Sequence, residues 1–118
     1  MRMPMLLLAA ASLAACSTEP APAWQSGDAE SGYQVVQDLC SDCHATGTTG
    51  ESRNAAAPPL RRALQNYRAD WLADDLHASR PVSLRRMPVF HFGEGHEYDI
   101  VAYLLTIQEK TPPVPPAG

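Results

Sequence analysis

Three stretches of the chain place apolar residues at steps of three and four, the spacing that predicts one-sided helices. The first begins after Asp28, a favourable helix cap, and runs into a pair of closely spaced cysteines. The second covers residues 70–78 and the third covers residues 97–108. A further helical turn is expected at residues 60–64. The pattern therefore predicts an all-α domain.

Residues 1–15 lack this spacing and have the composition of an export signal. Arg2 supplies a positive start, and residues 5–11 form an apolar run. That run is shorter than the roughly 20 apolar residues that a helix needs to cross a bilayer. The segment ends in Leu13-Ala14-Ala15-Cys16, which resembles the bacterial lipoprotein cleavage box, whose cysteine becomes the lipidated first residue. An ordinary signal peptide cut nearby, with Cys16 left as a free thiol, is the alternative.

A lipidated Cys16 would anchor the mature chain to a membrane, because each buried CH₂ contributes about 0.8 kcal/mol. The resemblance implies export to the periplasmic side in a Gram-negative-type bacterium, and Ser17 favours the outer membrane. Residues 16–26 are rich in Pro and Ala and predict a semi-rigid tether. Residues 111–118 are proline-rich and are expected to be disordered. Residues 27–110 remain as one folded domain.

The sequence Cys40-Ser41-Asp42-Cys43-His44 follows the first predicted helix. Two cysteines three apart, followed at once by a histidine, are the attachment signature for c-type haem. Positions i, i+3 and i+4 share one helix face, so both thiols can reach two vinyl groups on one porphyrin edge while His44 lies under the iron. A redox C-x-x-C pair would need a βαβ setting, and a zinc site would need a second ligand pair. Neither pattern occurs in this sequence.

The domain is small and the cysteine count is odd. About 85 residues give only a marginal apolar core, so a covalent haem would supply the missing apolar surface. If Cys40 and Cys43 carry haem, Cys16 is the one cysteine left of three, and no disulfide can form.

In chain order, the motifs resemble those of class I cytochrome c, a family of small proteins with one haem. Gly32 and Val36 stand eight and four residues before Cys40, where the family has a small and a larger apolar residue that cross the last helix. Pro58-Pro59-Leu60 matches the family's Pro-x-Leu element, and Met87-Pro88 matches its Met-Pro element. The resemblance covers residues 27–110 and implies a small cytochrome c fold, with three or four helices around one covalently bound haem c.

The resemblance also assigns roles to single residues. It implies that the carbonyl of Pro58 accepts a hydrogen bond from His44, which orients the ring, and that Leu60 packs on the haem. Trp71 is expected to lie in the core against the haem edge, within reach of a haem propionate. Met87 is the implied axial iron ligand on the side opposite His44.

Three histidines compete with Met87 for that position. His77 lies in the second predicted helix and is expected at the surface. His91 and His96 flank Phe92-Gly93 and stay open as alternatives, because a lone methionine often only fills a core.

The resemblance implies an electron carrier and not an enzyme: a membrane-anchored cytochrome that passes single electrons between redox protein partners through a His/Met-ligated haem. A haem-based ligand sensor or a peroxidase, with a displaceable sixth ligand, is the alternative. Contacts with partners should be small and quickly reversed.

The charge indicates no nucleic-acid role. After removal of residues 1–15, eight of the nine Lys and Arg remain against thirteen Asp and Glu, a net charge of −5. The arginines are nevertheless grouped beside the Pro-x-Leu and Met-Pro elements, as Arg61, Arg62, Arg85 and Arg86. This grouping predicts a basic rim that would orient acidic partners; the alternative is that these arginines are solvated surface residues, some of them paired with haem propionates.

Overall fold

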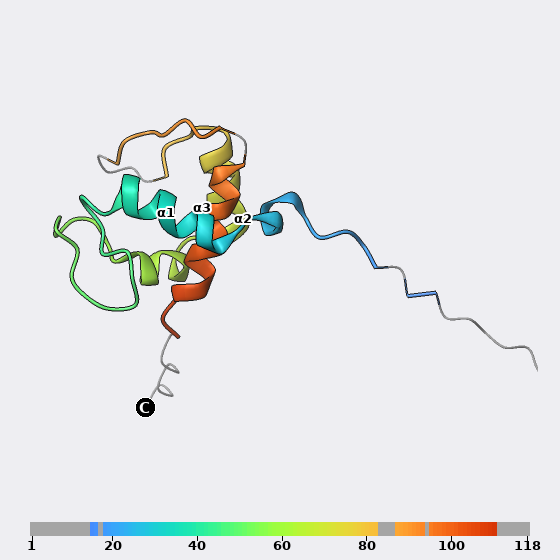
Figure 1. Ribbon diagram of the computed structural model, residues 1–118, viewed down its shortest axis with the longest axis horizontal. Coiled ribbons are helices and arrows are strands. Elements are labelled where there is room, and N and C mark those ends of the chain that lie inside the picture. The colour runs from blue at the N-terminus through green and yellow to red at the C-terminus, as the bar shows by residue number, and fades with distance from the viewer. Residues whose placement is uncertain (1–14, 17, 83–86, 94, 111–118) are drawn as a thin grey trace, which may run out of the picture.

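The computed structural model describes residues 15–16, 18–82, 87–93 and 95–110, and within these ranges every regular element is a helix. Three are α-helices: α1 (Ala29–Cys40), α2 (Ala69–His77) and α3 (His96–Ile107). Two are short 3₁₀ helices: η1 (Ala23–Ser26) and η2 (Leu60–Gln65). Figure 1 shows α1 crossing α3 near the centre of the molecule, with α2 beside α3. The predicted all-α class is confirmed, and α2 and α3 each begin and end one residue earlier than the spacing predicted.

Local chemistry marks the start of α1 but not the start of α3. The Asp28 side chain accepts a hydrogen bond from the backbone N–H of Ser31 at 2.7 Å, which is the N-cap that the sequence predicted. α3 begins instead after Gly95, whose φ of 88° lies in the left-handed region, and it has no side-chain cap. Glu97 and Asp99 in its first turn favour this end of the helix through the helix dipole.

The crossing of α1 and α3 depends on close backbone approach. Gly32 and Val36 are the buried residues of α1, as the resemblance implied. Beside them the Asp99 carboxylate accepts hydrogen bonds from the backbone N–H of Asp28 at 2.7 Å and from the Ser31 hydroxyl at 2.9 Å. These bonds tie the first turn of α1 to the first turn of α3.

The apolar core lies where α2, α3 and η2 meet the buried face of α1. Its buried members come from all four elements: Val36, Leu60, Leu72, Ala73, Leu76, Ile100, Val101, Tyr103, Leu104 and Ile107. Within the described ranges, the largest side chains that are fully buried are those of Val36 and Val101. A core with so few fully buried large side chains agrees with the marginal size predicted for this domain.

The folded domain begins earlier than predicted, which corrects the tether boundary. Residues 23–26 form η1, and Trp24 packs against the core, so these residues belong to the domain. Residues 15–16 and 18–22 are exposed and contain no helix or strand. The segment leads away from the helices in Figure 1. Trp24 moves the boundary because its partly buried indole packs against the core and so stabilises the short helix that carries it.

Four features expected from the sequence lie outside the described residues. They are the signal segment up to residue 14, Ser17, the Arg85–Arg86 pair, and the tail from residue 111. Among the helices of the described ranges, none is both long and apolar enough to span a bilayer.

Candidate functional site

The two cysteines and the histidine of the motif come from a single turn at the end of α1. Cys40 is the last residue of the helix, and its carbonyl accepts hydrogen bonds from the N–H groups of Cys43 at 3.2 Å and of His44 at 2.9 Å. The motif thus forms one further turn beyond the end of α1. Both thiols are free; Cys40 is half-buried and Cys43 is exposed. One short turn therefore presents two thiols and an imidazole together.

The environment of Cys40 disfavours a redox-active dithiol. Burial, assisted by the nearby Cys43, raises the pKa of the Cys40 thiol to about 11. Reactive C-x-x-C pairs instead have a thiol pKa lowered by positive neighbours or a helix N-terminus. These cysteines follow a helix C-terminus, and Cys40 stays protonated near neutral pH.

His44 is held by the residue that the Pro-x-Leu element predicted. Its Nδ1 lies 2.7 Å from the carbonyl oxygen of Pro58, fourteen residues further along the chain. Because a carbonyl oxygen can only accept, Nδ1 is the donor in this contact, and in the neutral tautomer Nε2 is the nitrogen with the lone pair. An imidazole oriented through one nitrogen, with the other available, is the usual state of a metal-ligating histidine.

Backbone hydrogen bonds place Pro58 beside the motif. The carbonyl of Ala45 accepts from Leu60 N at 2.9 Å, and the carbonyl of Cys43 accepts from Asn54 N at 3.1 Å. The Ser52 hydroxyl accepts from Ala45 N at 2.9 Å. The connection from the motif to η2 is therefore folded back on itself. Its two ends, at Ala45 and Leu60, are bonded to each other next to His44.

Leu60 and Tyr103 join this connection to the core. Leu60, the last residue of the Pro-x-Leu element, is 8% exposed and packs in the core cluster. The Tyr103 hydroxyl donates to the carbonyl of Thr46 at 2.6 Å, and its ring meets Tyr33 edge to face at 5.5 Å. Burial raises the pKa of Tyr103 above its ordinary value, so the hydroxyl stays a donor. The last helix thus supports the segment directly after the motif.

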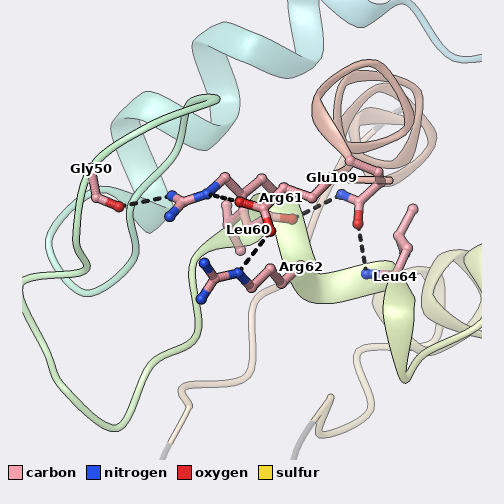
Figure 2. A network of polar contacts seen from close by, with 7 residues as sticks. Gly50, Leu60, Arg61, Arg62, Leu64 and Glu109 are labelled. Atoms are coloured by element: carbon pink, nitrogen blue, oxygen red, sulfur yellow. Dashed lines mark hydrogen bonds and ion pairs between the residues drawn. The ribbon is translucent and has the colours of Figure 1, made fainter. Parts of the chain in front are cut away.

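Arg61 has a role that the sequence did not reveal. It is 5% exposed, and its Nε donates to Glu109 Oε1 at 2.8 Å. Its Nη1 donates to the carbonyl of Gly50 at 2.8 Å (Figure 2). The Arg62 Nε donates to the second Glu109 oxygen at 2.9 Å, and these two partners hold the pKa of Glu109 below its ordinary value. Arg61 therefore links the loop after the motif, η2 and the end of α3.

A neighbouring glutamine completes this network. The Gln108 amide donates to the carbonyl of Leu60 at 2.9 Å, and its oxygen accepts from Leu64 N at 3.0 Å (Figure 2). Gln108 and Glu109 follow α3 directly, so the chain from the last helix covers η2. No sequence signal pairs them with η2, because the partners stand more than forty residues apart.

These contacts correct the prediction for one residue of the basic rim, Arg61. Arg61 is buried, and both Arg61 and Arg62 form ion pairs with Glu109. One carboxylate offsets only one of the two positive charges, so Arg62, whose side chain is 49% exposed, still presents positive charge at the surface. The other two residues of the predicted rim, Arg85 and Arg86, lie outside the described residues.

Trp71 also departs from its expected place in the core. Its ring is 58% exposed, and the Arg68 guanidinium lies 5.0 Å from the ring centroid. The buried side of α2 is formed by Leu72, Ala73 and Leu76. Trp71 lies on the other side, next to hollows of about 220 and 510 Å³. Trp71 lies outside the protein's own core because α2 turns the adjacent positions inward, and its place against the haem edge stays a prediction.

The four possible axial ligands differ in exposure and partners. Met87 is partly buried, whereas His77, His91 and His96 are exposed. Each histidine uses its Nδ1: His77 contacts Glu97 Oε1 at 2.6 Å, His91 contacts Ser79 Oγ at 3.0 Å, and His96 contacts Asp99 Oδ2 at 3.4 Å. His77 is at the surface, as predicted, and also stacks on Tyr98. Met87 is thus the least exposed of the four.

The donor set of the turn fits a covalently attached haem. Two free thiols and the His44 imidazole share a single turn. The Nδ1 of His44 is bonded to Pro58, and its Nε2 is available. Among the described residues, no three His, Cys, Asp or Glu side chains gather into a group that could hold a metal ion. No family model, no curated protein and no solved structure matches this chain.

Proposed function

We propose that this chain is a c-type cytochrome that carries single electrons between redox proteins. One observation carries the proposal: His44 Nδ1 lies 2.7 Å from the Pro58 carbonyl, in the turn that presents two free thiols. Sequence spacing alone predicts the thiols and the imidazole. An accidental C-x-x-C-H motif would have no reason to orient its histidine through a carbonyl fourteen residues away.

In this proposal Cys40 and Cys43 would hold the haem through thioethers, and His44 Nε2 would ligate its iron. Once bound, the haem iron would supply one-electron chemistry between its ferrous and ferric states. The Pro58 carbonyl fixes the His44 ring and makes the imidazole a stronger ligand. Leu60, from the same element, supplies apolar surface next to the site.

Met87 is the proposed second axial ligand. It is partly buried, it precedes α3, and a thioether sulfur stabilises the reduced iron more than a second imidazole does. A bound sulfur leaves no open position for an external ligand, which favours electron transfer over sensing or peroxidase chemistry. Redox partners would make a small, short-lived contact.

Covalent attachment of haem and its ligation test this function separately. The full chain, produced with a c-type haem attachment system, should retain haem after denaturing electrophoresis. Cys40→Ala with Cys43→Ala should lose it, whereas Cys16→Ser is a control that should keep it. A wild-type chain without covalent haem would contradict the proposal.

The absorption spectrum identifies the sixth ligand. The ferric protein should show the weak near-infrared band of sulfur–iron coordination, and the spectra of both oxidation states should be those of a six-coordinate low-spin haem. A five-coordinate spectrum, or one that changes on exposure to carbon monoxide without denaturant, would favour the sensor or peroxidase.

We further propose that Cys16 is lipidated. Cys16 is exposed, in a segment that leads away from the folded domain (Figure 1), so an acyl chain there would not disturb the core. Cys16→Ser should move the protein from the membrane fraction to the soluble periplasmic fraction with an unchanged haem spectrum. Full retention in the membrane fraction would show that something other than this cysteine is the anchor.

A further inference from the structure

The connection from α2 to α3 carries Met87 and is closed at its base by two side chains. Ser79 follows α2, and its Oγ lies 3.0 Å from the Nδ1 of His91. Met87 stands between these two residues in the chain, four positions before His91. In Figure 1 the orange segment from Met87 to Gly93 returns toward the start of α3. The Ser79–His91 contact therefore joins two limbs of the connection. The outgoing limb is residues 78–82, which follow α2, and the returning limb is residues 87–93, which lead to α3.

The conformation of Ser79 indicates that its side chain is used. Its φ of 52° makes it the only described residue other than glycine in the left-handed region. Helices commonly end with a residue in this conformation, and glycine fills the position at the lowest cost. Serine costs more there than glycine and adds only a CH₂OH group. In this structure that group contacts His91.

The outgoing limb is held rigidly where it leaves α2. The backbone N–H groups of Ala78, Ser79 and Arg80 donate to the carbonyls of Asp74, Leu76 and Asp75 at 2.8–3.2 Å. The Asp75 carboxylate also accepts from Arg80 Nε at 2.6 Å and from the Tyr67 hydroxyl. These bonds fix the backbone that carries the Ser79 side chain.

A second contact joins residues just outside the Ser79–His91 pair in the chain. His77, the last residue of α2, lies with its Nδ1 2.6 Å from Glu97 in the first turn of α3. The Glu97 residue is 3% exposed, and the His77 ring stacks on Tyr98 with 5.7 Å between centroids. The His77–Glu97 contact joins the end of α2 to the start of α3. The Ser79–His91 contact is therefore the one that reaches the limb that bears Met87.

We propose that Ser79 and His91 are positioning residues for Met87: their hydrogen bond closes the base of the connection and holds the sulfur where it can ligate. This inference rests on the proposed function, since it assumes that Met87 is the sixth ligand. His91 would then serve by fixing the limb, not as a rival ligand. Loss of the bond would let the limb move away and weaken the sulfur–iron contact without unfolding the helices.

The test is displacement of the sulfur by added imidazole in the ferric protein, followed in the absorption spectrum. Ser79→Ala and His91→Ala should each tighten imidazole binding by about threefold to tenfold, the effect expected for loss of one side-chain hydrogen bond. His91→Asn keeps a polar atom near the place of Nδ1 and should restore the wild-type affinity. Ser26→Ala removes a hydroxyl that bonds only to the nearby Ala23 carbonyl, and it is the matched control.

The double variant Ser79→Ala with His91→Ala separates a shared bond from two independent effects. If the residues act through one hydrogen bond, the double variant should bind imidazole no more tightly than either single variant. Additive effects, or wild-type affinity in both single variants, would overturn the inference. So would an altered ligation spectrum in His91→Asn, which would make His91 itself a ligand.

Amide hydrogen exchange of Met87 and of residues 89–92 provides a measurement that does not depend on sulfur ligation. Exchange should accelerate in Ser79→Ala and His91→Ala and stay at the wild-type rate in Ser26→Ala. If wild-type protein lacks the sulfur–iron band, the Met87 assignment fails, and exchange still tests the contact between the limbs. If the band is present but exchange and imidazole affinity do not change, only the positioning role fails.

Discussion

Gly32 of α1 lies against the backbone carbonyl of Asp99 of α3 with no room for a side chain between them. A Cβ at Gly32 would overlap that carbonyl and touch the Tyr103 side chain. Substitution cannot be relieved by a small rotation, because the obstacle is backbone within a helix. The crossing of the first and last helices therefore depends on this glycine.

Gly32→Ala should destabilise the domain by about 3 kcal/mol or prevent folding, since overpacking costs 1–3 kcal/mol even where side chains can yield. The measurement is denaturant unfolding followed by circular dichroism. Gly47→Ala is the control, because a Cβ at Gly47 meets nothing within 4 Å. Equal unfolding midpoints for the two variants would contradict this account of the crossing.

Arg61→Met should cost about 2–3 kcal/mol of unfolding free energy, and Arg62→Met should cost clearly less. The difference follows from burial: the Arg61 side chain is 6% exposed, whereas that of Arg62 is 49% exposed. Arg61 also bonds the Gly50 carbonyl, which would lose its partner. Chemical denaturation of both variants measures this, and a larger loss from Arg62→Met would be inconsistent with the network.

Acid should destabilise the domain partly through Asp99. Burial alone would raise the pKa of this carboxyl, but bonds from Asp28 N, Ser31 and His96 lower it below its ordinary value of 3.8. A lowered folded-state pKa means that the stabilisation is complete above the unfolded value and is lost as pH falls through the folded value. Asp99→Asn should therefore flatten the dependence of unfolding free energy on pH below about 4. An unchanged acid limb in this variant would contradict the assignment.

Met87→His should keep the iron six-coordinate and lower its midpoint potential, because imidazole stabilises the ferric state more than a thioether does. Met87→Ala should abolish the near-infrared band. Potentiometric titration and ferric spectra of both variants measure these effects. A band that survives Met87→Ala would exclude Met87 as the ligand, and His96→Ala would be the next variant to examine.

Local features of this protein were predictable because they depend on neighbouring residues. Apolar spacing predicted α2 and α3 to within one residue at each end. Asp28 was recognisable as a cap because its bond reaches only to Ser31. The cysteines and His44 of the candidate site needed only their spacing, since one turn of backbone brings them together.

The His44–Pro58 bond was predicted only through a resemblance between motifs. No periodicity or propensity relates an imidazole to a carbonyl fourteen residues away. The bond requires the intervening loop to fold back, and Ser52, Asn54 and Leu60 supply the hydrogen bonds that hold it there.

The sequence by itself therefore determined the three α-helices, the Asp28 cap of α1 and the chemistry gathered in one turn at the end of α1. Tertiary structure alone decided that Arg61 is buried, that Trp71 is exposed and that Ser79 meets His91. Each of these depends on how helices are rotated and where the chain returns. The charged side chain of Arg61 in η2 can be buried because Glu109, 48 residues later, lies beside it and accepts its hydrogen bond. Burial of a polar group follows from its partner's position, and that position is set by packing of the whole domain.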